Sequence, residues 1–140
     1  MIAEWIYDGK PLTGTEPFIQ EYRAFVYVII NLKDGRKYFG KKRLQFTSHK
    51  KRKGRKHRIK VVKESDWISY WGSSDQLKVD IERFGANCFR REIIRFCRSL
   101  SESNYYELRE QMINDVLLHP DKFYNAYVGG RISRKQLGIK

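Results

Sequence analysis

The chain has 140 residues, only two of them cysteines, and its apolar runs fall far short of the roughly 20 residues that cross a bilayer. These totals argue against a disulfide framework and a transmembrane helix, and they predict a single domain over residues 1–140 that folds around its own core. The formal net charge is +13, but twelve Lys or Arg residues lie between Lys41 and Lys63, where no acidic residue occurs, and the other 17 nearly balance the 16 Asp and Glu. A positive field confined to one segment indicates a polyanionic partner, with nucleic acid favoured over a membrane surface.

Residues 1–22 form an N-terminal extension. Their start, MIAEWIYDGK, lacks the basic first part and the apolar block of a signal peptide, so we expect an intracellular, cytoplasmic protein. Trp5 to Tyr7 precede the turn-like Asp8-Gly9-Lys10-Pro11. This pattern predicts a short extended segment or hairpin that packs on the main sheet.

The run from Ala24 to Leu32 is rich in β-branched and aromatic residues, and Asp34-Gly35 is a strong hairpin signal before Arg36 to Gly40. Apolar residues occupy both alternating sets of positions in the first arm, so that strand should be covered on both faces and lie centrally in a sheet. Tyr27 and Tyr38, one on each arm, can then face the same side.

The segment 44–63 is a basic insert. Apolar residues are sparse at its start, and the middle, HKKRKGRKHR, cannot bury enough surface to offset the entropy of ordering it. We expect a short helix or turn near residues 41–50 and then a mobile basic loop that grips phosphate with little sequence choice. The predicted nucleic-acid contacts are Lys41, Lys50, Lys51, Arg52, Lys53, Arg55, Lys56 and Arg58.

An amphipathic helix is predicted over residues 74–84. Ser73 and Gln76 match a capping box, apolar residues repeat at helical spacing, and Gly85 is placed to end the helix. The next apolar segment, residues 88–96, predicts a strand, although its alternation is imperfect.

A second helix should follow, capped by Ser101 or Ser103 and ended by Pro120. Its expected apolar stripe is Tyr105, Leu108, Met112 and Val116. The predicted order is strand, strand, helix, strand, helix.

Five short motifs in this order carry a family resemblance. They are Phe25-Val26-Tyr27 with Tyr38-Phe39-Gly40, Trp71-Gly72-Ser73-Ser74, Arg91-Glu92-Ile93-Ile94, Glu107 with Gln111, and Phe123-Tyr124-Asn125. Over residues 24–132 the chain resembles the GIY-YIG nuclease family, and it looks closest to phage-borne members of the homing-endonuclease type. Two positions depart from the family pattern, since Phe25 stands where Gly is usual and Phe39 replaces Ile.

The resemblance implies a small α/β (α+β) fold with a three-stranded antiparallel sheet flanked by helices. It also implies a metal-dependent DNA endonuclease that acts on double-stranded DNA in the host cytoplasm. One active site cuts one strand, so cutting both needs a homodimer or sequential nicking. The chain has little room for a recognition domain, so specificity must come from the basic insert, the termini or a separate partner.

In the family a helix glutamate binds one divalent ion, which makes Glu107 the expected ligand for Mg²⁺ or Mn²⁺. Glu110 competes, because the sequence allows a shift of one turn. Tyr38 is the expected water activator or orienter and Tyr27 its partner, although the roles could exchange and both could be ordinary core tyrosines. A tyrosine acts as a base only if cations or a metal lower its pKa from about 10.

The family also uses an arginine on the phosphate, at a position that Ser48 occupies here. Arg43 upstream or Arg52 downstream could supply the guanidinium, with Arg43 preferred, or Lys42 could contribute a point charge instead. Neighbouring His49 is an alternative general base. Asn125 resembles a late asparagine of the family, which would hold the phosphate region or the chain itself, but local backbone bonding before a turn explains it equally well.

Two other functions remain open. A non-catalytic nucleic-acid-binding protein on the same fold is suggested by the missing arginine, and a small basic RNA-binding protein by the charge alone. A zinc site from His49, His57, Cys88 and Cys97 is disfavoured because these residues lack the close paired spacing of structural zinc ligands.

Overall fold

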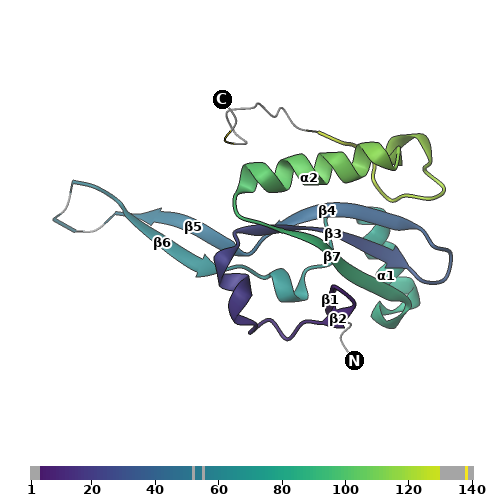
Figure 1. Ribbon diagram of the computed structural model, residues 1–140, viewed down its shortest axis with the longest axis horizontal. Helices are drawn as coiled ribbons and strands as arrows, with labels where there is room; N and C mark the ends of the chain where they lie inside the picture. Colours follow the sequence, from purple (N-terminus) through teal and green to yellow (C-terminus); the bar gives the residue numbers. More distant parts are fainter. Residues whose placement is uncertain (1–3, 52, 55, 130–137, 139–140) are drawn as a thin grey trace.

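A computed structural model describes residues 4–51, 53, 54, 56–129 and 138. The strands are β1 Trp5–Tyr7, β2 Lys10–Pro11, β3 Ala24–Asn31, β4 Lys37–Arg43, β5 Gln45–Lys50, β6 Ile59–Glu64 and β7 Phe89–Cys97, and the helices are α1 Asp75–Phe84 and α2 Leu100–Ile113. The main sheet has the order β2-β1-β7-β3-β4, with α1 and α2 packed on opposite faces, while β5 and β6 form a separate two-stranded ribbon (Figure 1). None of the described helices is long and apolar enough to cross a membrane.

The predicted central hairpin is confirmed. Strand β3 lies between β7 and β4 and is antiparallel to both. Its residues from Ala24 to Ile29 are all buried, because α1 covers one face and α2 the other. The register pairs Tyr27 with Gly40 and Ile29 with Tyr38, so the two tyrosines lie on one face as predicted.

The three predicted antiparallel strands are β3, β4 and β7, but the sheet is larger than predicted. The N-terminal segment joins it, because β1 pairs in parallel with β7 and antiparallel with β2. Buried Trp5 anchors this addition: its Nε1 donates to the Trp67 carbonyl oxygen at 2.8 Å, and its ring contacts Phe25 edge-on at 5.0 Å.

Helix α1 matches the predicted amphipathic helix, and Gly85 ends it at a φ of 88° that favours glycine. The cap differs from the prediction, because Ser74 rather than Ser73 accepts a hydrogen bond from the Leu77 amide at 3.2 Å. Leu77 is fully buried in the larger core cluster. The other apolar residues of this cluster are Trp5, Ile19, Phe25, Tyr27, Ile29, Leu44, Trp67, Phe89, Ile93, Phe96 and Tyr124.

The imperfect alternation of β7 has a structural cause. Its register against β3 shifts between Val26, which pairs with Arg95, and Tyr27, which pairs with Ile93. Ile94 is therefore an extra residue, as in a β-bulge, and it is 38% exposed while Ile93 is buried.

The predicted details of the second helix are wrong. Ser99 caps α2, which ends at Ile113 well before Pro120. Tyr105 and Met112 of the expected stripe are exposed, whereas polar residues on the same helix are buried. The buried pair is Ser103 and Gln111. Helix α2 thus presents a partly polar face to the sheet, which apolar periodicity could not indicate.

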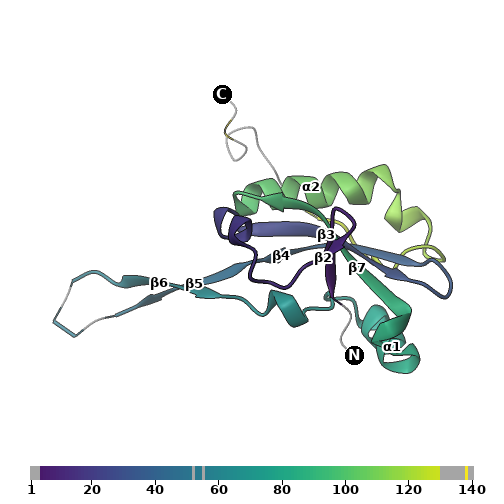
Figure 2. The same cartoon turned by 60° about the horizontal axis from the view of Figure 1, so that its bottom comes forward.

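The expected helix or turn near 41–50 is also wrong. The following loop is shorter than expected, because the described residues between Lys50 and Ile59 lie in turns, bends and irregular segments while β6 begins at Ile59. Strand β4 continues to Arg43, and β5 and β6 then pair antiparallel over six residue pairs, from Gln45↔Glu64 to Lys50↔Ile59. The β-branched residues of β6 favour this extended pairing. The ribbon projects away from the sheet in both views (Figures 1 and 2). Arg52 and Arg55 lie outside the described residues.

Candidate active site

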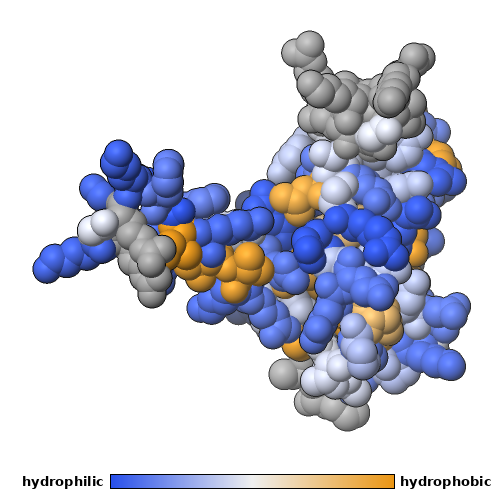
Figure 3. All heavy atoms as spheres, turned by 60° about the vertical axis from the view of Figure 1, so that its left-hand side comes forward, coloured by the Kyte–Doolittle hydropathy of each residue, from blue (hydrophilic) through white to orange (hydrophobic). Residues whose placement is uncertain are grey.

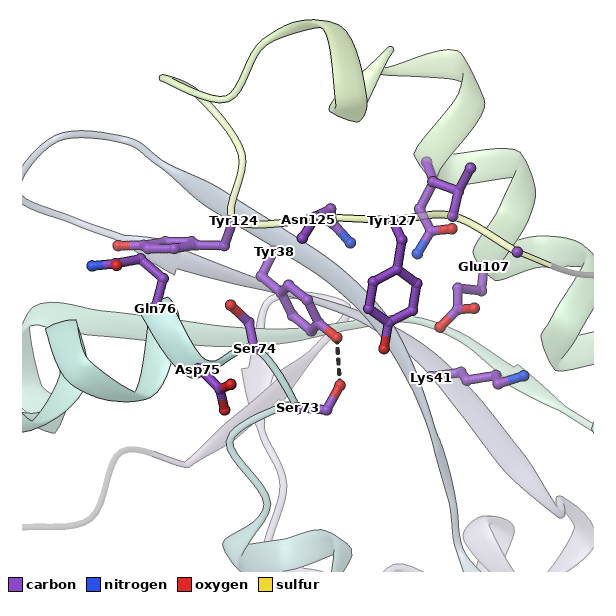
Figure 4. A pocket seen from close by; sticks show the side chains of 14 residues that line it. Tyr38, Lys41, Ser73, Ser74, Asp75, Gln76, Glu107, Tyr124, Asn125 and Tyr127 are labelled. Carbon is purple, nitrogen blue, oxygen red and sulfur yellow. Dashed lines mark hydrogen bonds between the residues drawn. The ribbon is translucent and has the colours of Figure 1, made fainter.

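A pocket of about 720 Å³ lies along β4, which is the last strand of the main sheet. Its walls come from the start of α1, from α2 and from the segment 124–129 (Figure 4). Side chains alternate across a strand, so Tyr38 faces the α1 side of β4 and Lys41 the α2 side. Both nevertheless line the pocket, because it extends from one face of β4 to the other beside the segment 124–129.

The Tyr38 hydroxyl is a candidate catalytic group in the pocket. It lies 2.8 Å from the Ser73 Oγ at the start of α1 (Figure 4). Partial burial raises the pKa of Tyr38, and the Ser73 hydrogen bond only partly opposes that effect. The hydroxyl is therefore neutral near pH 7, so it can orient a water molecule but accepts a proton only if a cation is brought close.

Tyr27 lies behind Tyr38, outside the pocket lining. It is 1% exposed, and its ring centroid is 6.2 Å from that of Tyr38. Burial raises the pKa of Tyr27 well above 10, with further contributions from Tyr38 and Tyr70. The structure therefore places Tyr38 at the pocket and Tyr27 as its support, and Gly40 leaves room for the Tyr27 ring against β4.

Glu107 reaches the pocket from α2, whereas Glu110 does not line it. Partial burial raises the pKa of Glu107, while the charge and the backbone N–H of Lys41 act in the opposite direction. The structure thus brings the preferred carboxylate of the two beside Tyr38.

Gln111, one helical turn beyond Glu107, also lines the pocket and is 5% exposed. Its Nε2 donates to the Phe39 carbonyl oxygen at 3.3 Å, but its buried Oε1 has no hydrogen-bond partner among the described residues. A buried acceptor without a donor is costly, so this oxygen suits a water or ion placed in the pocket.

The predicted phosphate cations are not brought to the pocket. Lys42 turns to the α1 side of β4, where its Nζ pairs with Asp66 at 2.6 Å and lies 4.1 Å from the Tyr70 ring centroid. Arg43 is exposed and outside the lining. The pocket cation is Lys41, which the sequence had assigned only to general nucleic-acid contact; its Nζ donates to Asn104 Oδ1.

Asn125 uses its amide on the chain itself. Its Oδ1 accepts from the Phe39 amide at 3.1 Å, and its Nδ2 donates to the Phe39 carbonyl oxygen at 2.8 Å. The Tyr124 amide also donates to the Lys37 carbonyl oxygen at 2.8 Å. These hydrogen bonds hold distant parts of the chain together rather than the local backbone, and they fix the segment after Asn125 along β4.

Sequence reasoning missed Ser73 and Tyr127 as pocket residues. The signal for Ser73 was the Ser73-Ser74 pair at a helix start: one serine caps α1, which leaves the other free to reach Tyr38. Tyr127 is 76% exposed, and its ring points into the same space as Tyr38 and Glu107 (Figure 4). No local pattern identified it.

The ribbon carries the remaining candidates. Ser48 and His49 are exposed on β5, outside the pocket lining. No group of three or more His, Cys, Asp or Glu side chains that could hold a metal ion occurs in the part of the chain that the structure describes. The donors at the pocket are instead two carboxylates, Glu107 on α2 and Asp75 at the start of α1, with amide and hydroxyl groups around them. So small a set of protein ligands suits an ion that keeps most of its water ligands.

Comparison with known proteins identifies the family of the chain. A family model described as "Putative endonuclease segE, GIY-YIG domain" matches residues 5–128. The curated protein named "Putative endonuclease segE" of Enterobacteria phage T4 is 28% identical over 106 residues, which cover 76% of this chain and 42% of that protein. The chain therefore spans less than half the length of this relative. No solved structure gives a significant match. Because the model spans most of the chain, including β1 and every strand and helix that forms the pocket, the chain belongs to the segE-type GIY-YIG domain family.

Proposed function

We propose that the protein is a divalent-metal-dependent endonuclease that hydrolyses phosphodiester bonds in double-stranded DNA. The observation that carries this proposal is the meeting of Tyr38 and Glu107, which are far apart in the sequence, in one pocket on the edge of the sheet. Membership of a family described by an endonuclease name supports the same reaction.

The pocket residues fit Mg²⁺ or Mn²⁺. Glu107 supplies a carboxylate oxygen as ligand, and the free Oε1 of Gln111 can accept a hydrogen bond from an ion-bound water. One carboxylate is sufficient for an ion that retains several waters. When bound, the ion supplies a more acidic water and neutralises charge on the phosphoryl oxygens.

The chain's own side chains have separate roles in the proposal. Tyr38, held by Ser73, orients the attacking water, and Tyr27 holds the Tyr38 ring from behind. Lys41 contacts the phosphate in place of the family's arginine, since it is the cation that lines the pocket among the described residues. Asn125 acts as a positioning residue through Phe39.

A single candidate active site, formed by the pocket at Tyr38 and Glu107 in the described part of the chain, implies one cut strand per binding event. Cutting both strands then needs a second subunit or a second event on the other strand. A homing role and a separate specificity partner remain proposals of the same kind.

The direct test uses supercoiled plasmid with Mg²⁺ or Mn²⁺. We expect the wild-type protein to convert it to the nicked circle, and Glu107→Ala and Tyr38→Phe to slow that conversion by at least about tenfold. Glu110→Ala is the matched control, because it lies on the same helix outside the pocket, and its rate should stay near wild type. Wild-type rates in both Glu107→Ala and Tyr38→Phe would refute the site.

The second candidate is a non-catalytic nucleic-acid-binding protein on this fold. Its motivating observation is that Ser48 takes the arginine position, while Lys42 is engaged by Asp66. Salt-sensitive DNA binding without cleavage under either metal would favour this candidate.

A further inference from the structure

The ribbon formed by β5 and β6 does little for the core. Beyond Leu44 and Gln45 at its base, most of its side chains are exposed, and the ribbon stands out from the body with a largely hydrophilic outer end (Figure 3). Its two strands hydrogen-bond only to each other within the described sheets. An isolated two-stranded hairpin is only marginally stable in water, so a ribbon of this length suits a surface that is completed by a partner.

The charge of the ribbon indicates which partner. Its one acidic residue is Glu64, at the base. The described basic residues are Lys50, Lys51, Lys53, Lys56, Arg58, Lys60 and Lys63, and all of them are exposed. A narrow projection with this density of exposed cations complements the phosphates that flank a nucleic-acid groove.

The two faces of the ribbon differ. Residues that pair directly across an antiparallel ladder share a face, so Thr47 lies beside Val62 and His49 beside Lys60. All four are exposed, and three of them carry hydrogen-bonding groups.

The opposite face carries three polar or charged residues, Ser48, Lys50 and Lys63, beside the apolar Phe46, Ile59 and Val61, and Ile59 and Val61 are partly covered. At its base the Phe46 ring centroid lies 5.1 Å from the Nζ of Lys42 on the body. The face of Thr47, His49, Lys60 and Val62 is exposed at all four positions and combines a hydroxyl, an imidazole and an ammonium group with an apolar side chain, so it is the face suited to reading base edges.

The width of a two-stranded ribbon selects the groove. Its strands lie about 4.8 Å apart, and with side chains the ribbon fits the roughly 12 Å wide major groove of B-form DNA. The deep, narrow major groove of A-form RNA does not admit it. We propose that β5 and β6 enter the major groove of duplex DNA and choose the sequence with the face of Thr47, His49, Lys60 and Val62. This inference rests on the proposed DNA nuclease function and adds to it the element that selects the site.

The position of the ribbon sets where that sequence lies. The chain runs from Lys41 in the pocket to His49 through eight residue steps, which span at most about 27 Å of extended strand. At about 3.4 Å per base pair this is about eight pairs, so the recognised bases lie on one side of the cut and within about one helical turn.

The first experiment measures sequence choice with Glu107→Ala protein, which separates binding from cleavage. Duplexes are selected from a random library, and guanine N7 methylation then maps contacts in the major groove. We expect interference within about one turn of the cut made by the wild-type protein. Adding Thr47→Ala and His49→Ala should reduce discrimination at those positions about tenfold or more. Ser48→Ala, equally exposed on the same strand but on the opposite face, is the matched control and should leave discrimination unchanged.

The second experiment measures the salt dependence of binding. The plot of log K, where K is the binding constant for DNA, against log salt has a negative slope. Replacing Lys50, Lys53 and Lys56 by Ser should make that slope shallower by about 2.7 and should lower the affinity at 0.15 M salt by about 100-fold. The control replaces three exposed lysines outside the ribbon, Lys33, Lys78 and Lys122, and should change the slope much less.

The outcomes separate this inference from the proposed function. If sequence choice depends on the ribbon but no cleavage occurs, the role of the ribbon in DNA recognition is supported and the proposed nuclease function is refuted. The role of the ribbon in DNA recognition would be overturned if the ribbon variants cut at the same positions as wild type, or if replacing the ribbon lysines left the salt slope unchanged. The proposed nuclease function would not be affected by either result. Tighter binding to duplex RNA than to duplex DNA would also overturn it.

Discussion

Gly40 connects the packing of the sheet to the candidate site. A Cβ at this position would lie 2.5 Å from the Tyr27 hydroxyl oxygen, 2.6 Å from its Cζ and 3.0 Å from Cε1 of Tyr38. The Tyr27 ring has little room to yield, because Trp5 lies 5.2 Å and Tyr70 6.1 Å from it between centroids. We therefore expect Gly40→Ala to destabilise the protein by about 1–3 kcal/mol through overpacking.

This cost competes with a gain. Replacing a strand glycine by alanine without a clash stabilises by about 0.5–1 kcal/mol, because the unfolded chain loses freedom. The clash at Gly40 should exceed that gain and lower Tm by about 3–12 °C for a chain of this size. Gly129→Ala is the matched control, since a Cβ there meets no atom within 4 Å, and its Tm should stay within about 1–2 °C of wild type.

Urea and thermal unfolding measure the stability change, and plasmid nicking measures the displacement of Tyr38. In the Gly40→Ala background, Tyr27→Phe removes the hydroxyl oxygen that lies 2.5 Å from the added Cβ but keeps the Cζ atom at 2.6 Å. This second substitution should therefore restore only part of the stability. Wild-type stability for Gly40→Ala would refute the view that the Tyr27 ring is fixed behind the pocket.

Three further predictions concern the pocket. Burial raises the pKa of Glu107, and only the ionised carboxylate binds metal. Cleavage should therefore fall as the pH drops through this raised pKa, at a higher pH than an exposed glutamate would give. Because the folded-state pKa is raised, the stability contributed by protonated Glu107 is present at low pH and lost as pH rises; Glu107→Gln should thus raise the metal-free Tm at pH 8 but not at pH 4. Ser74→Ala should cost about 1 kcal/mol of unfolding free energy by removing the α1 cap, whereas Ser73→Ala should leave stability near wild type and slow nicking. Asn125→Ala breaks two buried hydrogen bonds to β4 and should cost about 1–3 kcal/mol, against little change for exposed Asn87→Ala, as urea titration can measure.

Local patterns were sufficient for the centre of the fold. The β3–β4 hairpin follows from strand residues on both sides of an Asp-Gly turn, and the period of two places Tyr27 and Tyr38 on one face. Glu107 was preferred over Glu110 from motif spacing, and the structure places Glu107 at the pocket.

The features that were not predicted from the sequence depend on contacts between residues far apart in the chain. The extended form of residues 45–50 depends on pairing with β6, across a segment whose composition resembles a loop. The choice among adjacent cations depends on α2, which brings Glu107 to the side of β4 that carries Lys41, while Asp66 engages Lys42 on the other side. Gln111 is polar on a covered helix face, so apolar periodicity predicted the wrong stripe.

The most direct test of the candidate active site is single-turnover cleavage of a linear duplex with Mg²⁺, measured together with DNA affinity. The account predicts that Glu107→Gln binds DNA about as tightly as wild type but cleaves at least about 100-fold more slowly, which corresponds to several kcal/mol of lost transition-state stabilisation. Glu110→Gln, on the same helix outside the pocket, should stay within a few-fold of wild type. Cleavage by Glu107→Gln at the wild-type rate, or loss of activity only in Glu110→Gln, would contradict the assignment.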